Sequence, residues 1–429
     1  YALGIMFRDF PGRVYAARKE CPLIIGVGEG ENFIASDMSA ILQYTRNYYL
    51  LDVDEIACIE KDKITIKDIH GNVVTKELQT ATWDVDAAQK GGFEHFMLKE
   101  IYEQPTAVKT TITPRITEGM PDFGECGLTD EKLAAYRKIF IVACGTAMHA
   151  GMVGKYVIEK LARTEVTVDI ASEFRYRDPL VSDDDLVILI SQSGETADTK
   201  EALRISKELG ADTLAFVNVK GSSIAREADM VMYTHAGPEI SVASTKAFSV
   251  QIAMMYMLAF KLAYAKGKID RETCAAYIKE LENISEALLY IGRGLDYALS
   301  MEGSLKLKEI SYIHSESYAA GELKHGTISL ITEQMPVIAV VTQHDLMEKT
   351  VSNIKEVKAR GAKVVLVCAQ DIEVEAETAD YIVRIPMVSD ILMPMLTVIP
   401  LQLIAYYTSV LRGNDVDQPR NLAKSVTVE

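Results

Sequence analysis

The chain has 429 residues, and its 45 Lys and Arg against 61 Asp and Glu give a formal net charge of −16. Such an acidic chain repels nucleic acid, whose binding proteins carry basic surfaces, so we expect no nucleic-acid partner. Hydrophobic residues make up 48% and charged residues 25% of the chain, a balance that excludes a disordered protein and predicts a globular one of about two to four domains.

The first 83 residues carry short apolar runs separated by turn residues. Runs such as 21–36 and 63–78 predict a separate, mainly β domain over residues 1–83. A linker over 84–125 follows. It contains a helical pattern that we expect to end at Pro105, because proline disrupts the interior of a helix.

An internal repeat organises the rest of the chain. The first copy runs from the apolar segment Leu186–Ile190, through a polar loop and a segment of helical period, to the apolar segment Thr213–Val217. The second copy follows the same plan from Val337–Val341 to the apolar run after Gly361. Unbroken apolar runs mark strands covered on both faces, and the helix between them supplies the crossover of a parallel pair. Both copies are therefore predicted to be βαβ units.

A further strand, glycine turn and helix precede each copy, at Phe140–Gly151 and at Leu289–Gly303. The predicted fold class is α/β, with two tandem, doubly wound, flavodoxin-like parallel sheets at residues 126–275 and 280–415. Residues 416–429 form a polar tail, and tails of this composition are usually disordered.

The polar loop of the first copy, Ser191–Thr196 (SQSGET), lies where a buried strand gives way to a helix. Its hydroxyl and amide side chains, with the exposed N–H groups of the helix start, predict an anion site, best suited to phosphate. An ordinary serine-rich helix cap is the alternative, but so many donors without any Lys or Arg favour the anion. The CGTA segment, Cys144–Ala147, ends the neighbouring strand and would line the same crevice.

A second polar cluster lies further along the chain. Helical spacing places Glu302, Lys306 and Glu309 near one face. His325 follows in a glycine-bounded loop. Ion pairing on a solvent-exposed face is the ordinary explanation of such spacing. The apolar residues between the charges favour instead a crevice in which acid, base and cation meet for proton transfer.

Signals for cofactors, metals and membranes are missing from the sequence. Walker A spacing does not occur, and Gly26–Phe33 lacks the later parts of a dinucleotide fingerprint, so we expect no cofactor. The 7 His lack HExxH spacing and the 6 Cys lack CxxC spacing, which predicts no metal and free thiols in a reducing compartment, the cytoplasm. No apolar run reaches the about 20 residues of a membrane span, and the Met-rich stretch 251–264 is predicted to fill the core.

Several long segments can be compared with known families: CGTA, SEFRYR, SQSGETADT, EISVASTKAF, EGSLKLKEISYIHSESYAAGELKHG and DVDQPRNLAKSVTVE. In this order they resemble the glutamine:fructose-6-phosphate aminotransferase, or glucosamine-6-phosphate synthase, family. The resemblance implies two tandem SIS (sugar isomerase) domains, preceded by the remaining β-rich part of an N-terminal-nucleophile glutaminase domain. It also implies the reaction, in which glutamine and fructose 6-phosphate give glutamate and glucosamine 6-phosphate, the first step of UDP-GlcNAc synthesis.

The resemblance further implies roles for residues that match the family's motifs. Glu309 would move a proton between C1 and C2 of the sugar, and Lys306 would tune its charge. Lys424, which the residues alone would leave as a solvated amine, would form a Schiff base with C2. His325 would open the sugar ring from the partner subunit of a homodimer. The binding residues would be Ser191, Gln192, Ser193 and Thr196 for the phosphate, Thr146, Val242 and Ser244 for the sugar, and Asp37 for glutamine.

Three features depart from the family's pattern. The chain begins at Tyr1, without the N-terminal Cys nucleophile and the early glutaminase motifs, so we expect it to retain only the sugar isomerase half. Ala147 stands where the family commonly has Ser. Near Ser285, a helical pattern runs directly into a strand pattern where the family has an additional segment, which indicates missing residues.

Two other functions fit part of the pattern. One is an ammonia-using isomerase or deglycase without glutaminase function. The other is a non-enzymatic regulator that senses sugar phosphates through its SIS domains. The acidic charge and the lack of a helix-turn-helix pattern argue against the regulator.

Overall fold

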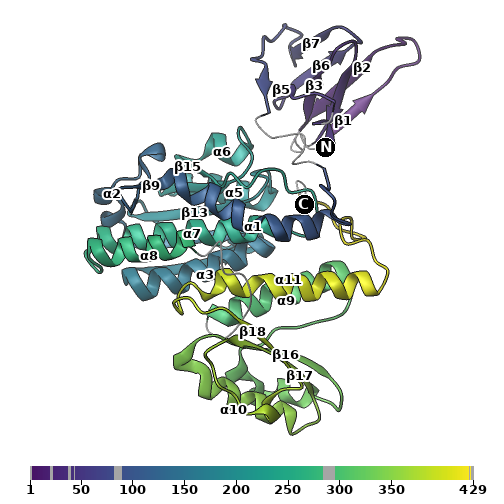
Figure 1. Ribbon diagram of the computed structural model, residues 1–429. Coiled ribbons are helices and arrows are strands. Elements are labelled where there is room, and N and C mark those ends of the chain that lie inside the picture. The colour runs from purple at the N-terminus through teal and green to yellow at the C-terminus, as the bar shows by residue number, and fades with distance from the viewer. Residues whose placement is uncertain are drawn as a thin grey trace.

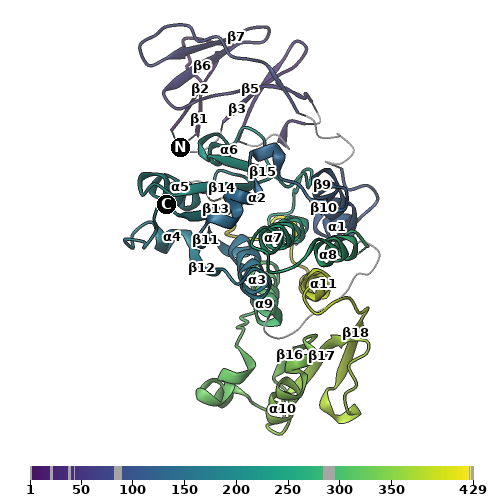
Figure 2. The same ribbon diagram turned by 90° about the vertical axis from the view of Figure 1, so that its left-hand side faces the viewer.

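The computed structural model describes residues 2–19, 23–36, 40–42, 44–81, 89–283, 295–424 and 426. Figure 1 shows three regions along the molecule: a β-rich region, a central α/β domain and a smaller α/β domain. The described end of the C-terminal tail returns to the central domain, near its sheet (Figures 1 and 2).

The N-terminal region is mainly β, as predicted, and consists of two antiparallel sheets. One has the strand order β1-β2-β6-β7 and the other β4-β3-β5-β8. One apolar cluster, which includes the fully buried Ala16 and Ile25, joins the two sheets. The strands are β1 (Ala2–Ile5), β2 (Val14–Arg18), β3 (Ile24–Val27), β4 (Asn32–Ala35), β5 (Asn47–Leu50), β6 (Glu55–Ile59), β7 (Ile64–Asp68) and β8 (Gln79–Thr80).

Helix α1 (Phe96–Ile112) passes through Pro105, so the predicted end of the helix at this proline is wrong. The side-chain amide of Gln104 donates to the carbonyl oxygen of Ile101 (3.2 Å), the acceptor that an N–H at Pro105 would otherwise serve. A substitute donor thus offsets part of the cost of the proline. A hairpin of β9 (Ile116–Thr117) and β10 (Met120–Pro121), then α2 (Asp130–Ala135), leads into the central domain.

The central domain contains one five-stranded sheet of order β12-β11-β13-β14-β15. All its neighbouring strands are parallel. This is the predicted flavodoxin-like order, and the chain reverses direction across the sheet between β11 and β13, where such folds bind ligands. The strands are β11 (Lys138–Ala143), β12 (Glu165–Ile170), β13 (Asp185–Ser191), β14 (Asp212–Val217) and β15 (Met230–Tyr233). The helices are α3 (Gly145–Ala162), α4 (Ala171–Phe174), α5 (Ala197–Glu208), α6 (Ser223–Glu227), α7 (Lys246–Ala265) and α8 (Arg271–Asn283).

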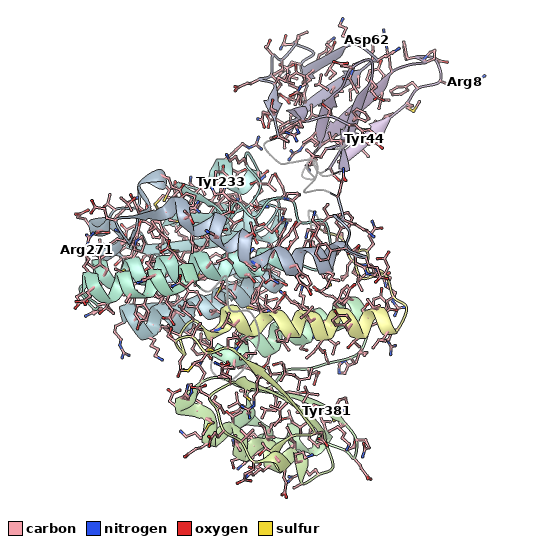
Figure 3. The ribbon with its side chains drawn as sticks, viewed as in Figure 1. Arg8, Tyr44, Asp62, Tyr233, Arg271 and Tyr381 are labelled. Atoms are coloured by element: carbon pink, nitrogen blue, oxygen red, sulfur yellow. The ribbon has the colours of Figure 1, made fainter. Side chains whose placement is uncertain are left out.

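The second α/β domain has a smaller described sheet, with the parallel order β16-β17-β18. The helix predicted within Leu289–Gly303 is observed as part of α9, whereas the strand predicted before it lies outside the described residues, as does the segment near Ser285. Tyr381, on the edge strand, is 68% exposed and projects from the domain (Figure 3). The elements are α9 (Leu295–Ser311), β16 (Pro336–Val341), α10 (Met347–Lys358), β17 (Lys363–Ala369), β18 (Tyr381–Ile385) and α11 (Met393–Leu411).

Two helices, α7 and α11, are long and apolar enough to cross a membrane by length and composition, although the sequence predicts no span. Their most apolar windows are 89% and 67% buried inside the structure. Figure 2, which looks along α7, shows this helix surrounded by α1, α3, α8 and α11. The Met-rich stretch lies on α7, where Met254, Met255 and Met257 are fully buried, so its predicted role in the core is confirmed.

Candidate active site

The loop Ser191–Thr196 joins β13 to α5 at the carboxyl edge of the central sheet. The Ser191 hydroxyl accepts the N–H of Gly194 (3.0 Å) and lies 3.0 Å from the hydroxyl of Thr196. The Ser193 hydroxyl accepts the N–H of Glu195 (3.2 Å). Thr196 holds the N-cap position of α5, but its hydroxyl contacts Ser191 rather than the helix N–H groups.

Gly194 gives this loop its shape. Its φ is +66°, and a Cβ at this position would lie 2.0 Å from the Ser222 hydroxyl. Both the left-handed backbone and the close approach of Ser222 require glycine. The loop therefore curls tightly and keeps its hydroxyl groups together.

The C-terminal tail folds over the start of α5. The N–H of Ala197, the first residue of α5, donates to the carbonyl oxygen of Val426 (3.3 Å). Further back, the Asp417 carboxylate accepts the N–H groups of Phe96 and Met97 at the start of α1 (2.9 and 2.8 Å). The Asp417 carbonyl oxygen accepts the N–H of Val242 (3.0 Å). These contacts explain why the tail, which the sequence predicts to be disordered, is packed against the central domain.

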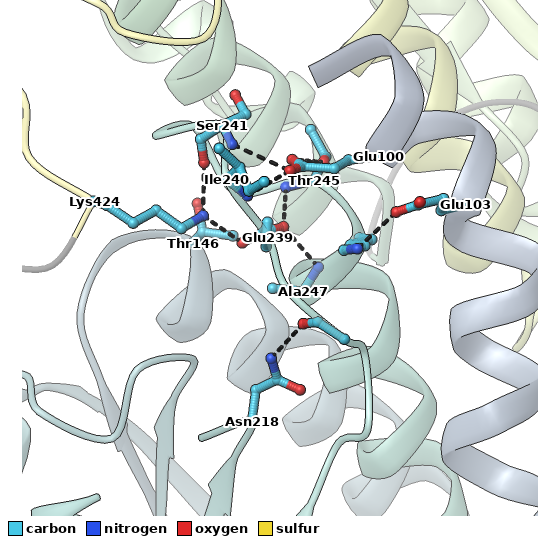
Figure 4. Close-up of polar contacts among 12 residues, drawn as sticks. Glu100, Glu103, Thr146, Asn218, Glu239, Ile240, Ser241, Thr245, Ala247 and Lys424 are labelled. Carbon is cyan, nitrogen blue, oxygen red and sulfur yellow. Dashed lines mark hydrogen bonds and ion pairs between the residues drawn. The ribbon is translucent and has the colours of Figure 1, made fainter. Parts of the chain in front are cut away.

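Lys424 of the tail points into the protein (Figure 4). Its Nζ donates to Glu239 Oε2 (2.7 Å) and to the carbonyl oxygen of Ser241 (2.6 Å). Its side chain is 26% exposed, and that of Glu239 is fully buried. Figure 4 shows Thr146, at the start of α3, close to this pair. A tail lysine is thus brought to the edge of the sheet on which the serine-rich loop lies.

Backbone N–H groups at the start of α7 hold the Glu239 carboxylate in place. Its Oε1 accepts the N–H groups of Thr245 (2.9 Å) and Ala247 (3.0 Å). Burial alone would raise the pKa of Glu239, but the charge and hydrogen bond of Lys424, together with these two N–H groups, hold that pKa below its ordinary value. Glu239 therefore remains a carboxylate.

A second buried carboxyl group, Glu100 of α1, contacts the loop that runs from Glu239 to the start of α7. It accepts the N–H groups of Ile240 (2.5 Å) and Ser241 (3.1 Å). Burial, and then the charge of Glu239, raise the pKa of Glu100 from 4.5 to about 8, against the opposing charges of Lys424 and Lys246. At neutral pH Glu100 is mostly protonated, and Glu239 carries the negative charge.

Helix α9 contributes a buried cluster of charges beside Thr146. Glu302 accepts the Thr146 hydroxyl (3.1 Å) and lies 2.7 Å from Nδ1 of His149. Lys306 Nζ lies 3.5 Å from Glu302 and 2.5 Å from Glu309. Since Lys306 is 1% and Glu302 0% exposed, the interpretation as solvent-exposed ion pairing is wrong.

The buried cluster on α9 interacts electrostatically with the Lys424 site. Burial would lower the pKa of Lys306, but Glu302 and Glu309 raise it above its ordinary value, and Glu239 adds to that effect. Lys306 is therefore an ammonium that interacts electrostatically with Glu302 and Glu309 in its own cluster and with Glu239 at the Lys424 site. The Glu309 side chain is 21% exposed and reaches the edge of the cluster.

The remaining predicted residues fall in different places. Val242 and Ser244 lie half-buried in the loop between Glu239 and α7. His325 is exposed in the second domain, and within the described ranges no hydrogen bond or ion pair joins it to the Lys424 site. Asp37 lies outside the described residues.

Two residues of the site are absent from the sequence-based prediction, Glu239 and Glu100. Glu239 begins the EISVASTKAF string, one of the strings that carry the family resemblance. That signal could have indicated it. Glu100 gives no such signal, because only the fold brings α1 to this loop.

Comparisons with known proteins agree with this geometry. The SIS domain model matches residues 132–261 and 283–412. A glutamine–fructose-6-phosphate aminotransferase (isomerizing) from Caldanaerobacter subterraneus subsp. tengcongensis is 53% identical over 454 aligned positions, which cover 100% of this chain and 74% of that protein. A protein of the same name from Clostridium acetobutylicum is 50% identical, with 100% and 74% covered.

Solved structures give a consistent result. The C-terminal domain of glucosamine-fructose-6-phosphate aminotransferase from Francisella tularensis superimposes with a TM-score of 0.74 at 41% identity, covering 77% of this chain and 100% of that one. A glucosamine-6-phosphate deaminase from Thermotoga maritima shares the fold, with a TM-score of 0.60 at 20% identity over 77% of this chain and 99% of that one.

Proposed function

This chain belongs to the glutamine–fructose-6-phosphate aminotransferase (isomerizing) family and contains two SIS domains, and we propose how its side chains share the chemistry. The reaction transfers nitrogen from glutamine to fructose 6-phosphate and yields glucosamine 6-phosphate and glutamate. Neither the glutaminase-free isomerase nor the sugar-phosphate sensor gains support from these relatives.

The phosphate of the sugar binds at Ser191, Gln192, Ser193 and Thr196. Hydroxyl and amide donors gather there beside the first N–H groups of α5, a 12-residue helix whose dipole favours an anion. The loop contains no Lys or Arg, so neutral donors hold the phosphate. Backbone N–H groups can serve at Ala147, where the family commonly has a hydroxyl.

Lys424 bonds to C2 of the open-chain sugar as a Schiff base. The observation that carries this proposal is the position of its Nζ, 2.7 Å from the buried Glu239 at the carboxyl edge of the sheet, rather than free in solvent. An iminium at C2 withdraws electrons and makes the adjacent proton easier to remove. Thr146, Val242 and Ser244 contact the sugar between this amine and the phosphate loop.

Glu309 moves the proton between C1 and C2. Its carboxylate contacts the buried Lys306 Nζ at 2.5 Å, which positions it at the edge of the site, where a carboxylate can act as a base. A single base that reaches both carbons is sufficient for the isomerisation from ketose imine to aldose amine.

His325 acts from a second copy of the chain, so the enzyme is a homodimer. The exposed position of His325 in the second domain supports a role across a subunit interface. Asp37 binds the α-amino group of glutamine. The five described cysteines are free thiols, which supports a cytoplasmic location.

Substitution of Lys424 tests this function. Lys424→Arg retains a cation for Glu239 but cannot form an imine, so synthesis of glucosamine 6-phosphate should fall to background both in this variant and in Lys424→Ala. Borohydride with fructose 6-phosphate should add the mass of the reduced sugar to the Lys424 peptide of the unmodified chain. Synthesis that persists in Lys424→Arg would contradict the proposal.

A further inference from the structure

The contact between Lys424 and Glu239 raises a question that the Schiff base leaves open, namely what the buried carboxylate does during the reaction. Glu239 is fully buried, and both of its oxygens are occupied, one by Lys424 and the other by two N–H groups at the start of α7. These hydrogen bonds hold the Glu239 side chain in one position, so its negative charge stays beside Lys424. The carboxylate is therefore a fixed anion at the nitrogen that reacts.

A carboxylate in this position can act as a base or as a counter-ion. A base must take up a proton, whereas the start of α7 and the ammonium of Lys424 both stabilise the ionised form of Glu239. The neighbouring Glu100 holds its proton at neutral pH, so one negative charge faces one positive charge. These surroundings favour the counter-ion.

The chemistry at Lys424 keeps a positive charge on the same atom for most of the cycle. When the amine attacks C2, a C–N bond forms and the C–O bond breaks. The oxygen leaves as water with two protons that come from the nitrogen, so an ammonium and a carbonyl give an iminium and water. The iminium nitrogen remains Nζ of Lys424, and the fixed anion remains beside it.

We propose that Glu239 is the counter-ion of Lys424, holding the ammonium at the sugar site before reaction and stabilising the iminium after it. The proposal rests on the Schiff base role proposed for Lys424. An opposite charge at this range raises the pKa of a cation by about 1–3 units, so Glu239 extends the pH range over which the iminium stays protonated. Lys424, Glu100 and Lys306 are the titrating groups whose charges act on Glu239.

Trapping with cyanoborohydride, which reduces the protonated iminium, tests the proposal. The chain is incubated with fructose 6-phosphate from about pH 5 to pH 10, and labelling of the Lys424 peptide is measured by mass spectrometry. In Glu239→Gln, whose amide oxygen can still accept the N–H groups of α7, the alkaline midpoint of labelling should fall by about 1–3 pH units. Glu239→Asp should restore the midpoint toward that of the unmodified chain.

The structure supplies a matched control and a second variant. Glu103 of α1 pairs with the buried Lys246 (2.6 Å), so Glu103→Gln removes a neighbouring ion pair and should leave the midpoint unchanged. Glu100→Gln removes the charge that Glu100 gains above about pH 8, and should move the midpoint down by less than Glu239→Gln does. This second variant tests the electrostatics even if Glu239→Gln does not fold, as judged by circular dichroism.

The outcomes separate this inference from the function on which it rests. If the unmodified chain is never labelled at Lys424, the Schiff base and the counter-ion both fail. If it is labelled and folded Glu239→Gln has the same alkaline midpoint, the counter-ion alone fails. An unchanged or higher midpoint in Glu100→Gln would also count against the counter-ion.

Discussion

The two α/β domains place different residues at the same point of the fold, the end of a buried strand before a helix. After β13, the loop Ser191–Thr196 gathers hydroxyl groups at the start of α5. After β16, the Thr342 hydroxyl donates to the buried Asp296 (2.7 Å), and His344 lies between Asp390 (2.7 Å) and Asp371 (3.0 Å).

The second loop is therefore satisfied by carboxyl groups from other segments, and the charge of Asp371 and Asp390 would repel a phosphate. A duplicated fold supplies two positions for a site, and the residues at each position decide whether a ligand binds there. The second domain serves the reaction differently, because its α9 places Glu302, Lys306 and Glu309 beside the site of the first.

Among the substitutions that test this comparison, Lys306→Met is expected to have the largest effect on stability and activity. Lys306→Met leaves the fully buried Glu302 without its cation, so the free energy of unfolding should fall by about 3–5 kcal/mol and synthesis should be lost. Lys308→Met, an exposed change on the same helix, should alter neither. Denaturant titration and product assay measure both effects. Equal stability of the two variants would show that α9 is not coupled to the central site.

Glu100 gives the central domain a pH-dependent stability. Because its pKa is raised from 4.5 to about 8, the folded chain holds a proton that the unfolded chain releases, so stability falls as pH rises between these values. Glu100→Gln should remove this slope, worth on the order of 3 kcal/mol, in denaturant titrations at about pH 5 and pH 9. Glu103→Gln, one turn later on α1, should keep the slope, and a variant Glu100→Gln that also keeps it would contradict the assignment.

A matched pair of substitutions compares the two loops directly. Ser191→Ala removes the hydroxyl that joins Gly194 and Thr196, and should raise the KM for fructose 6-phosphate about tenfold. Thr342→Ala removes the hydroxyl donor of the fully buried Asp296 and leaves it the backbone N–H of residue 342, so it should cost about 1 kcal/mol of stability and leave that KM unchanged. Similar KM changes in both variants would contradict the claim that only the first loop binds the phosphate.

His344 gives the smallest expected effect. Although partial burial would lower its pKa, Asp390 and Asp371 raise it above 6.5. The protonated ring stabilises the folded chain below pH 6.5, and this contribution is lost as pH rises through the raised pKa. Because the ring is 37% exposed, His344→Gln should cost less than about 1 kcal/mol at pH 6 and nothing at high pH. Thermal unfolding at the two pH values checks this, and a loss that grows with pH would contradict it.

The sequence predicts the parts of the fold that depend on local pattern. The apolar runs Leu186–Ile190 and Thr213–Val217 are observed as parts of the buried strands β13 and β14, and the loop between β13 and α5 has the predicted position at the edge of the sheet. These predictions succeed because a strand covered on both faces has to be apolar along its whole length.

The rest depends on contacts between distant segments. The tail carries no apolar face, so its packing through Asp417 and Val426 could not be predicted from composition. Glu100 and Glu239 meet only because α1 packs beside the start of α7, and Pro105 continues its helix because Gln104 replaces a lost donor. Each of these features depends on a partner that sequence periodicity does not reveal.

A crystal structure of the chain with fructose 6-phosphate tests the central claim most directly. We expect the phosphate at Ser191–Thr196, none at the end of β16, and a covalent bond from Lys424 Nζ to C2 of the sugar. A sugar bound at the second domain, or one bound at the first with Lys424 turned out into solvent, would contradict it.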